Sequence, residues 1–292
     1  GRNQLNLAIG TAQFGLDYGI SNFSGKVNLD EVRKIIGFAQ KSGINTIDTA
    51  RDYGDSEESI GKCDVSSFKV VTKIGTVLGH EDNISNWVEL EIKSSIKKLR
   101  LQKIYGILLH RPQELLLKNG DELYKSILKL KRKKLVEKIG VSVYSINDLK
   151  NIVDRFNIDI IQLPINIINQ EILHSGFLQE LKGKNIEIHA RSCFLQGLLL
   201  MDYNDIPLKF KKWSNIFLDW HDWLNENNIN AVQGCLSFIN SINGIDKVVV
   251  GIENVNQLKE LVNYSNTIGI KSFPNLSCND VNLIDPSNWK SL

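Results

Sequence analysis

The sequence has no apolar run near the roughly 18 residues that a membrane-spanning helix needs. Its N-terminal region also lacks the long apolar segment of a signal peptide. The sequence also has no large excess of positive or negative charge. Its 35 Lys and Arg residues nearly balance its 33 Asp and Glu residues, so the net charge is +2. Such a balance creates no global field for nucleic acid or a membrane. We therefore expect a cytoplasmic protein whose partner is a small molecule, and the sequence carries no signal for its oligomeric state.

Cysteine is scarce, and the four residues present are far apart in the chain. Cys63, Cys193, Cys235 and Cys278 form no CxxC pair and have no histidine at ligand spacing. This pattern argues against a disulfide framework and a zinc site, so we expect four reduced thiols and no bound metal. A linker rich in Pro, Gly and Ser is also missing, so residues 1–292 are expected to form a single domain.

Eight short runs rich in Ile and Val have the length of a strand. They cover residues 5–10, 44–48, 68–75, 103–110, 136–143, 158–164, 186–190 and 246–251. Several are continuously apolar, as expected for strands that are covered on both faces. Strands that alternate with helices form parallel sheets, and a count of eight favours a closed (β/α)8 TIM barrel of the α/β class over two doubly wound domains.

Between these runs, apolar residues recur at helical spacing. Helices are predicted over residues 29–43, 85–99, 120–135, 145–156 and 254–265. Ser85, Ser145 and Asn254 are suitable N-caps for three of them. The third helix contains the basic run KLKRKK at 129–134, which indicates a solvated face outside the barrel rather than a nucleic-acid site.

Two segments do not fit a simple alternation of strands and helices. Residues 200–244 are longer than one helix and predict an enlarged seventh unit. Their tryptophans, at positions 213, 220 and 223, have the spacing of helical core residues, which favours packing over a substrate box. Residues 271–292 are predicted to form an extended C-terminal tail that wraps the surface over one mouth of the barrel.

Polar side chains follow several predicted strands at their C-terminal ends, where TIM barrels hold their active sites. Asp48, Lys73 and His110 end three consecutive runs, and Tyr53 lies five residues beyond Asp48. Alone, each has an ordinary structural interpretation: a turn-capping carboxylate, a lysine with a buried stem, a core histidine and a loop tyrosine. Together, an acid, an amine, an imidazole and a phenol at one barrel mouth indicate proton transfer.

Six motifs occur in order along most of the chain. They are GTAQFG (10–15), GINTIDTARDYGDSEESIGK (43–62), VVTK (70–73), LLHRP (108–112), IGVS (139–142) and VVVGIENVNQLKEL (248–261). In this order they resemble the aldo-keto reductase superfamily. The resemblance implies a (β/α)8 barrel that reduces an aldehyde or ketone with NAD(P)H. It also implies a catalytic tetrad of Asp48, Tyr53, Lys73 and His110.

The four residue types suit this chemistry. Hydride addition to a carbonyl builds negative charge on oxygen, so a proton must arrive as the charge grows. A free phenol with a pKa near 10 is a weak acid at pH 7, and the Lys73 ammonium is expected to lower the pKa of Tyr53. Asp48 is expected to hold the lysine by an ion pair. His110 is expected to donate a hydrogen bond to the carbonyl oxygen and orient it.

No GxGxxG motif is present, so a Rossmann-type cofactor site is not expected. By resemblance, the cofactor lies extended across the barrel mouth, beside Gly10 and Thr11. Ser142 and Gln162, which end the fifth and sixth runs, would bind the nicotinamide carboxamide. The family usually has Asn after that serine, but Val143 stands here, so one hydrogen bond is expected to be absent.

The resemblance also places the remaining parts of the cofactor. Arg191 aligns where an aromatic residue usually stacks on the nicotinamide, and a guanidinium plane can also stack. The segment from Ser192 to Gly197 would line the pyrophosphate.

The adenosine end falls at the start of the last predicted helix. Gly251, Glu253, Asn254 and Gln257 would meet it there, and a helix N-terminus suits phosphate. A carboxylate repels a 2′-phosphate and can accept a bond from a 2′-hydroxyl, so Glu253 makes NAD(H) an alternative to the family's usual NADP(H). If Glu253 points to solvent, the family's usual preference for NADP(H) is expected instead.

Two other functions remain open on the sequence. One is a non-catalytic, nicotinamide-binding regulatory barrel, and the other is a Schiff-base lyase that uses Lys73. The reductase is favoured because neither alternative requires both Tyr53 and His110. Residues 15–22 and the tail to Trp289 are expected to border the substrate pocket, and polar residues in the first of these favour a sugar or polyol carbonyl.

Overall fold

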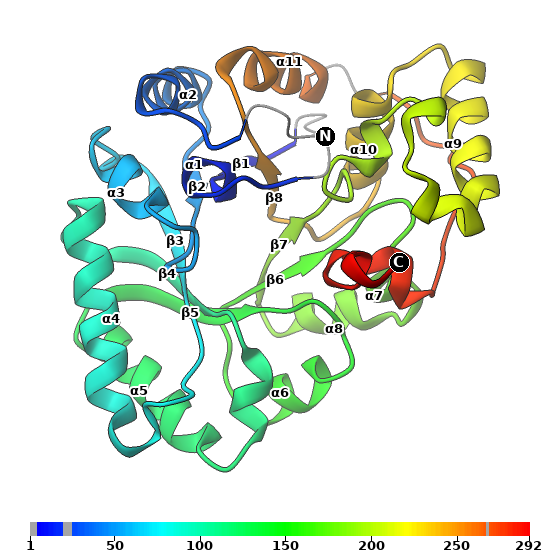
Figure 1. The fold of residues 1–292 in the computed structure, drawn as a ribbon. Helices are drawn as coiled ribbons and strands as arrows, with labels where there is room; N and C mark the ends of the chain where they lie inside the picture. Colours follow the sequence, from blue (N-terminus) through cyan, green and yellow to red (C-terminus); the bar gives the residue numbers. More distant parts are fainter. Residues whose placement is uncertain (1–4, 20–24, 267–268) are drawn as a thin grey trace.

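A computed structural model describes residues 5–19, 25–266 and 269–292. Eight parallel strands close into one barrel in sequence order, and helices surround it (Figure 1). The strands are β1 Leu7–Gly10, β2 Thr46–Asp48, β3 Lys69–Ile74, β4 Ile104–Leu109, β5 Val136–Ser142, β6 Ile160–Pro164, β7 Glu187–Arg191 and β8 Lys247–Gly251. Seven of the eight predicted runs contain one of them, and the run 186–190 stops one residue before the end of β7, so the predicted single-domain TIM barrel is confirmed.

The barrel closes between its first and last strands. Leu7 of β1 pairs with Val248 of β8, and the register continues to Gly10 opposite Gly251. The strands are buried on both faces, which explains their continuous Ile and Val content. A small separate cluster of Val71, Leu108 and Ile160, from three different strands, fills the barrel interior. The packed interior leaves the strand ends as the place where polar chemistry can be held.

The helices cover the outside of the barrel. They are α1 Ala12–Gly15, α2 Leu29–Lys41, α3 Ser56–Gly61, α4 Ile84–Leu99, α5 Gly120–Arg132, α6 Leu149–Arg155, α7 Glu171–His174, α8 Phe177–Gly183, α9 Ser214–Glu226, α10 Ala231–Asn240, α11 Val255–Ser265 and α12 Val281–Ile284. Among these described helices, none combines the length and the apolarity that crossing a membrane requires. The basic run at 129–134 spans the end of α5 and the following turn, where Lys129, Arg132, Lys133 and Lys134 are exposed.

One of the three predicted N-caps is correct. Asn254 caps α11, because its side chain accepts from the backbone N–H of Gln257. Ser85 and Ser145 are not caps: α4 begins at Ile84 after a short 3-10 turn, and α6 begins only at Leu149. Ser145 instead accepts from the N–H of Asn147 within a local turn.

The chain between β7 and β8 forms three short 3-10 turns followed by α9 and α10. Trp220 is fully buried, and its ring stacks on that of Trp223 with centroids 5.6 Å apart. Trp213 is also buried, so these tryptophans form core, as their spacing predicted.

The C-terminal tail packs on segments that follow β6 and β7, and the Cys278 N–H donates to the Ile168 carbonyl in the loop after β6. Trp289 packs edge-on against Phe210 of the β7–β8 segment, with ring centroids 5.0 Å apart, and its indole N–H donates to the carbonyl of Leu283. Lys209 also donates to the Trp289 carbonyl. None of the residues 271–292 is part of the cavity wall described below, and the contact of this tail with the substrate stays a prediction.

Candidate active site

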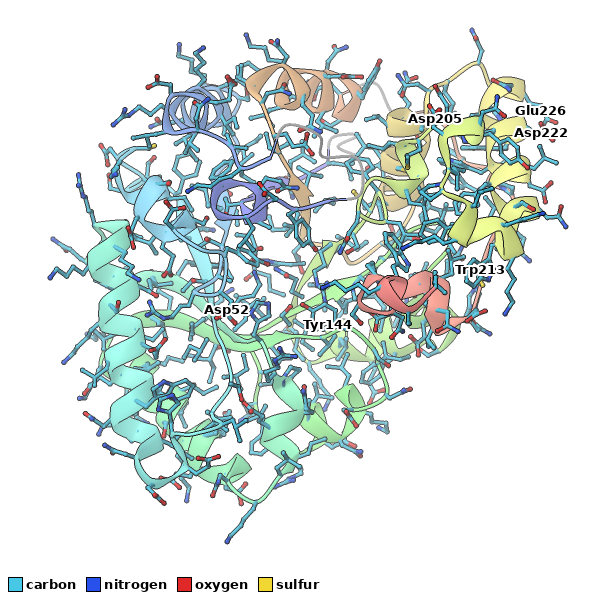
Figure 2. All side chains as sticks on the ribbon, in the orientation of Figure 1. Asp52, Tyr144, Asp205, Trp213, Asp222 and Glu226 are labelled. Atoms are coloured by element: carbon cyan, nitrogen blue, oxygen red, sulfur yellow. The ribbon has the colours of Figure 1, made fainter. Side chains whose placement is uncertain are left out.

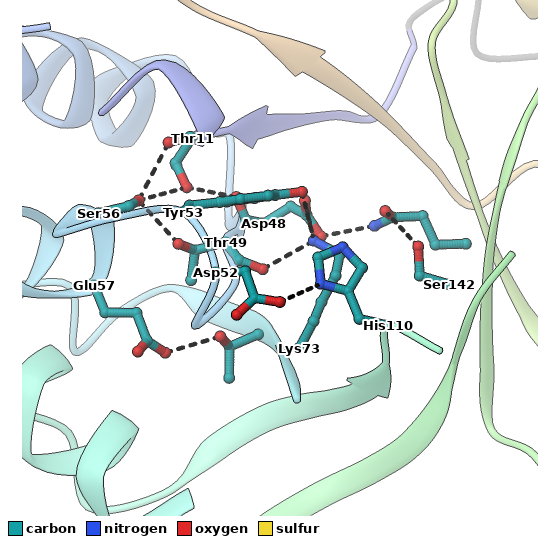
Figure 3. Close-up of polar contacts among 12 residues, drawn as sticks. Thr11, Asp48, Thr49, Asp52, Tyr53, Ser56, Glu57, Lys73, His110 and Ser142 are labelled. Carbon is teal, nitrogen blue, oxygen red and sulfur yellow. Dashed lines mark hydrogen bonds and ion pairs between the residues drawn. The ribbon is translucent and has the colours of Figure 1, made fainter. Parts of the chain in front are cut away.

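Four side chains meet at the C-terminal ends of neighbouring strands (Figure 3). Asp48 ends β2, Lys73 lies near the end of β3 and His110 follows β4, while Tyr53 comes from the β2–α3 loop. The rings of Tyr53 and His110 lie edge to face with centroids 6.0 Å apart. The structure thus brings together the four residues predicted as the tetrad.

Lys73 is buried, with 1% of its surface exposed, and its ammonium has three partners. Nζ lies 2.8 Å from Oδ2 of Asp48, 2.9 Å from the Thr49 carbonyl and 3.3 Å from the Tyr53 hydroxyl. An ammonium has donors but no acceptor, so the Tyr53 oxygen must accept this bond. The single hydroxyl hydrogen of Tyr53 is therefore left for another acceptor, which suits a proton donor.

The other oxygen of Asp48 is also held. Nε2 of Gln162 donates to Oδ1 of Asp48 over 2.7 Å, and Oγ of Ser142 lies 3.4 Å from Oε1 of Gln162. Thr11 fixes the backbone of the same residue, because its hydroxyl donates to the Asp48 carbonyl over 2.8 Å. Two side chains predicted to bind the nicotinamide carboxamide thus contact the tetrad through Asp48.

The pKa of Tyr53 moves in the direction opposite to the prediction. Burial raises the pKa well above the ordinary value, and the charge of Asp48 raises it further. Arg191 acts in the lowering direction without reversing the shift. The phenol therefore keeps its proton at neutral pH, as a general acid must.

His110 is neutral in this site. Burial lowers its pKa to about 3, and the positive charges of Lys73 and Arg191 contribute to the shift. Nδ1 of His110 lies 3.7 Å from Oδ2 of Asp52, which is itself largely exposed. A neutral imidazole acts through one N–H and one lone pair, so His110 can orient a carbonyl without adding a charge.

Close packing of two glycines holds the loop that carries Tyr53. A Cβ atom at Gly15 would lie 1.7 Å from the Tyr53 carbonyl oxygen. A Cβ atom at Gly54 would lie 2.3 Å from the Gly15 carbonyl, and Gly54 has φ +55°. The loop therefore sits directly against α1, which fixes the position of the phenol.

A cavity of about 270 Å³ opens beside this tetrad. Thirteen of the fifteen predicted site residues line it: Gly10, Thr11, Asp48, Tyr53, His110, Ser142, Gln162, Arg191, Ser192, Gly197, Gly251, Glu253 and Gln257. Lys73 lies beneath the cavity rather than on its wall. Asn254 does not line it either, because its side chain caps α11.

Three polar residues of this wall, Gln13, Asp52 and Tyr144, were not predicted from the sequence as site residues. Asp52 and Tyr144 lie within the ring of helices (Figure 2). Tyr18 and Gln196 join the first loop to the β7 loop, because the Gln196 amide donates to the Tyr18 hydroxyl over 2.9 Å. Asp52 and Tyr144 follow closely after β2 and β5, a signal that residue type alone did not single out. Of the predicted pocket segment 15–22, positions 20–22 fall outside the described residues.

Arg191 ends β7 and is held by two contacts. Its guanidinium lies 4.1 Å from the centre of the Tyr144 ring, and Nη2 donates to the Val143 carbonyl. Its Nε is buried without a hydrogen-bond partner among the described residues. A guanidinium plane thus stands at the position predicted to stack on the nicotinamide.

The loop after β7 has unusual backbone geometry. Ser192, Leu195 and Gln196 have positive φ angles of 58°, 51° and 52°, and Gly197 follows with 91°. Such conformations cost roughly 1–2 kcal/mol for each residue that carries a Cβ atom. Strain of this kind is typical of loops that present backbone N–H groups to an anion.

The far end of the cavity carries acidic side chains near the start of α11. Glu253 lines it, and burial raises the pKa of its carboxyl. Glu31 of α2 reaches the same helix end and accepts from the Val255 N–H over 2.9 Å. The Glu253 N–H donates to the Gln257 side chain over 2.7 Å. Among the described residues of the cavity wall, the basic side chains are Arg191 and His110, and both lie near the tetrad.

Comparisons with known proteins agree with this architecture. A model of the aldo/keto reductase family matches residues 6–276. A comparison with curated protein sequences gave no match. Among solved structures, an aldo-keto reductase from Bacillus halodurans in its holo form has a TM-score of 0.69 at 16% identity, over 92% of this chain and 93% of that one.

Two further structures are similar. A glycerol dehydrogenase from Gluconobacter oxydans has a TM-score of 0.69 at 20% identity, over 92% of this chain and 88% of that one. A Pseudomonas aeruginosa protein assigned as an aldo-keto reductase has a TM-score of 0.66 at 20% identity, over 90% of both chains. At these identities the likeness concerns the fold.

Proposed function

This chain belongs to the aldo/keto reductase family, and we propose that it reduces an aldehyde or ketone to an alcohol with a nicotinamide cofactor. The observation that carries the proposal is the contact of the buried Lys73 ammonium with the hydroxyl of Tyr53, which lines the cavity. Because the Tyr53 oxygen accepts from Lys73, the hydroxyl hydrogen of the neutral phenol is free for transfer. The neutral imidazole of His110 lies beside it.

The cavity has the features that a dinucleotide needs. At Gly251, a Cβ atom would lie 2.6 Å from Nε2 of Gln13, so a larger residue there would displace the Gln13 side chain in the cavity wall. Oε1 of Gln13 and Nε of Arg191 are buried without partners among the described residues, which leaves polar groups for a ligand. We assign Ser142 and Gln162 to the carboxamide and the loop 192–197 to the pyrophosphate. Such a cofactor, when bound, supplies the hydride.

The chain's own residues supply the proton that the reduction also needs. Tyr53 donates its hydroxyl hydrogen to the substrate oxygen as negative charge grows there. The Lys73 ammonium stabilises the phenolate that remains, and Asp48 holds that ammonium in place. His110 donates a hydrogen bond that orients the substrate oxygen. Its low pKa keeps the imidazole neutral, so it does not compete with Tyr53 as an acid.

We further propose that the preferred cofactor is NAD(H) rather than NADP(H). The support is two carboxylates near the start of α11, since Glu253 lines the cavity and Glu31 of α2 accepts from the Val255 N–H. A 2′-phosphate bound at this end would meet their negative charges. Like charges repel, whereas a carboxylate accepts hydrogen bonds from ribose hydroxyls.

For the substrate, we propose a small polyhydroxy carbonyl compound, such as a short sugar. The support is the polar lining near Tyr53, namely Tyr18, Asp52 and Tyr144. Burial raises the pKa of Tyr18 to about 12, so its hydroxyl stays neutral and can donate or accept. A pocket whose side chains hydrogen-bond the hydroxyl groups of a substrate binds analogues without those hydroxyl groups much more weakly.

Steady-state assays of the purified protein test these proposals directly. Glyceraldehyde, a short aldose and a benzaldehyde would each be supplied with NADH and with NADPH, and oxidation of the cofactor followed by absorbance. We expect turnover that is fastest with a hydroxylated aldehyde and NADH. Cofactor binding without turnover on any carbonyl would favour a regulatory barrel. An imine trapped on Lys73 by borohydride would favour a lyase, although the three partners of its buried ammonium argue against that.

A further inference from the structure

Gln162 reaches across the top of the barrel to the carboxylate of Asp48. The two residues lie on β6 and β2, four strands apart in a barrel of eight, and 114 positions apart in the chain. Their side-chain atoms Nε2 and Oδ1 are 2.7 Å apart. Both residues are buried, with 1% and 3% of their surface exposed. The bond is therefore shielded from water. Hydrogen bonds to a charged group are strongest in such a buried environment.

The Gln162 amide has only one orientation that satisfies its neighbours. A carboxylate paired with an ammonium has no hydrogen to donate, so the NH₂ group of the amide must face Asp48. The amide oxygen then faces Ser142, whose hydroxyl lies 3.4 Å away and must be the donor of that pair. A ligand carboxamide at this end therefore meets an amide whose better donor is already engaged.

Both oxygens of Asp48 are consequently fixed by side chains from opposite sides. Oδ2 accepts from Lys73 over 2.8 Å, and Oδ1 accepts from Gln162. With both oxygens held, the carboxylate cannot turn about its side-chain bond without breaking a buried charged hydrogen bond. The ammonium that it anchors lies 3.3 Å from the Tyr53 hydroxyl. A continuous chain of contacts thus runs from Gln162 to the phenol.

We propose that Gln162 is a positioning residue of the tetrad, which holds Asp48 in the rotamer that keeps Lys73 beneath the Tyr53 hydroxyl. This inference rests on the proposed function, and it gives Gln162 a second role beyond the carboxamide subsite. Without the amide, Oδ1 is a buried acceptor with no donor, so its charge is less offset and acts more strongly on Tyr53. Asp48 already raises the pKa of Tyr53, and the phenolate becomes still less favourable.

Two substitutions test this role. Gln162→Met keeps the length of the side chain and removes both polar atoms. We expect kcat at saturating cofactor to fall about tenfold or more, because small displacements of reacting groups slow turnover strongly. Gln162→Glu is more specific: two carboxyl groups in contact share a proton, and only the protonated form can donate to Asp48. Its kcat should recover as the pH falls, through an ionisation that the parent lacks.

Gln113→Met, at an exposed position, is the matched control and should leave kcat and its pH profile at the parent values. Cofactor dissociation constants are measured for every variant by quenching of tryptophan fluorescence. If both Gln162 variants weaken cofactor binding while kcat and the pH profile at saturation stay parental, Gln162 contacts only the cofactor and the proposal is wrong. If Gln162→Met does not fold, Gln162→Glu at low pH provides the same comparison.

A readout without turnover separates this proposal from the proposed function. In protein labelled at the tyrosine ζ-carbon, the Tyr53 resonance is assigned by its loss in Tyr53→Phe. It should move in Gln162→Met and stay in place in Gln113→Met. If the parent reduces no carbonyl but the Tyr53 resonance still moves in Gln162→Met, the proposed reductase activity is contradicted and the positioning role of Gln162 is retained. An unmoved resonance would overturn the positioning role whatever the activity.

Discussion

The Lys73 ammonium lies 3.3 Å from the Tyr53 hydroxyl and also faces the centre of the same ring, 4.8 Å away. The positive charge thus contacts both the oxygen and the π face of the phenol. This arrangement favours the phenolate that forms when the proton leaves, although burial keeps the resting phenol neutral.

Tyr53→Phe should abolish carbonyl reduction and leave cofactor binding nearly intact. Loss of a positioned acid typically slows turnover by about 10²–10⁴-fold. The measurement is kcat/KM on a reactive aldehyde, with the cofactor dissociation constant from tryptophan quenching. Tyr105→Phe makes the same change at the other end of the barrel, where the hydroxyl bonds Glu187, and should retain activity. Turnover of Tyr53→Phe within a few-fold of the parent would remove Tyr53 as the acid.

Lys73→Met should slow the reaction and change its pH dependence. Without the ammonium, the pKa of Tyr53 should rise further above its already raised value, so any alkaline loss of rate should move to higher pH. Lys69→Met, at the exposed start of the same strand, is the control. A profile of parental shape would show that Lys73 does not tune the phenol.

Glu253→Arg should raise NADPH affinity by about tenfold or more, equal to about 1.4 kcal/mol, with little change for NADH. The substitution replaces a charge that repels a 2′-phosphate with one that attracts it. Glu260→Arg, exposed two turns further along α11, makes the same charge change away from the cavity. The decisive quantity is the ratio of the two dissociation constants, and an unchanged ratio would place Glu253 away from the ribose.

His110 should make the protein less stable in acid. Its pKa is about 3 when folded but near 6.5 when unfolded, so between these values the unfolded chain binds more protons. The free energy of unfolding should therefore fall as the pH drops from about 6.5 towards 3, by at most about 1.4 kcal/mol per pH unit from this group. His110→Asn should flatten that part of a plot of stability against pH. An unchanged slope would contradict the lowered pKa.

Gly15→Ala should displace Tyr53, because the new methyl group would overlap its carbonyl oxygen. Overpacking of this kind costs about 1–3 kcal/mol, so we expect a lower Tm together with lost activity. Gly37→Ala is the control: nothing lies within 4 Å of its Cβ position in α2, and Ala suits a helix interior. Equal effects of the two substitutions would show that the Tyr53 loop can shift freely.

The sequence predicted the barrel well because its signal is local. Each strand is recognisable as a short run of Ile and Val, and each tetrad residue lies close to the C-terminal end of a strand or in the loop that follows it. The direction of the Tyr53 pKa shift could not be obtained in this way, because it depends on how completely the loops bury the phenol. The bond from Gln162 to Asp48 and the contact of Glu31 with Val255 were equally hidden. They join positions 114 and 224 residues apart, so only the closed barrel brings them together.

Barrel closure also joins the beginning of the chain to its end. The cavity wall combines positions 10–13 with positions 249–257, and β1 pairs with β8. At about 5–20 residues per second, synthesis of these two segments is separated by roughly 10–50 s. During that interval the edge of β1 that later receives β8 stays open, and the adenosine end of the site does not exist. A nicotinamide cofactor bound as proposed above therefore cannot stabilise the growing chain before positions 249–257 join β1.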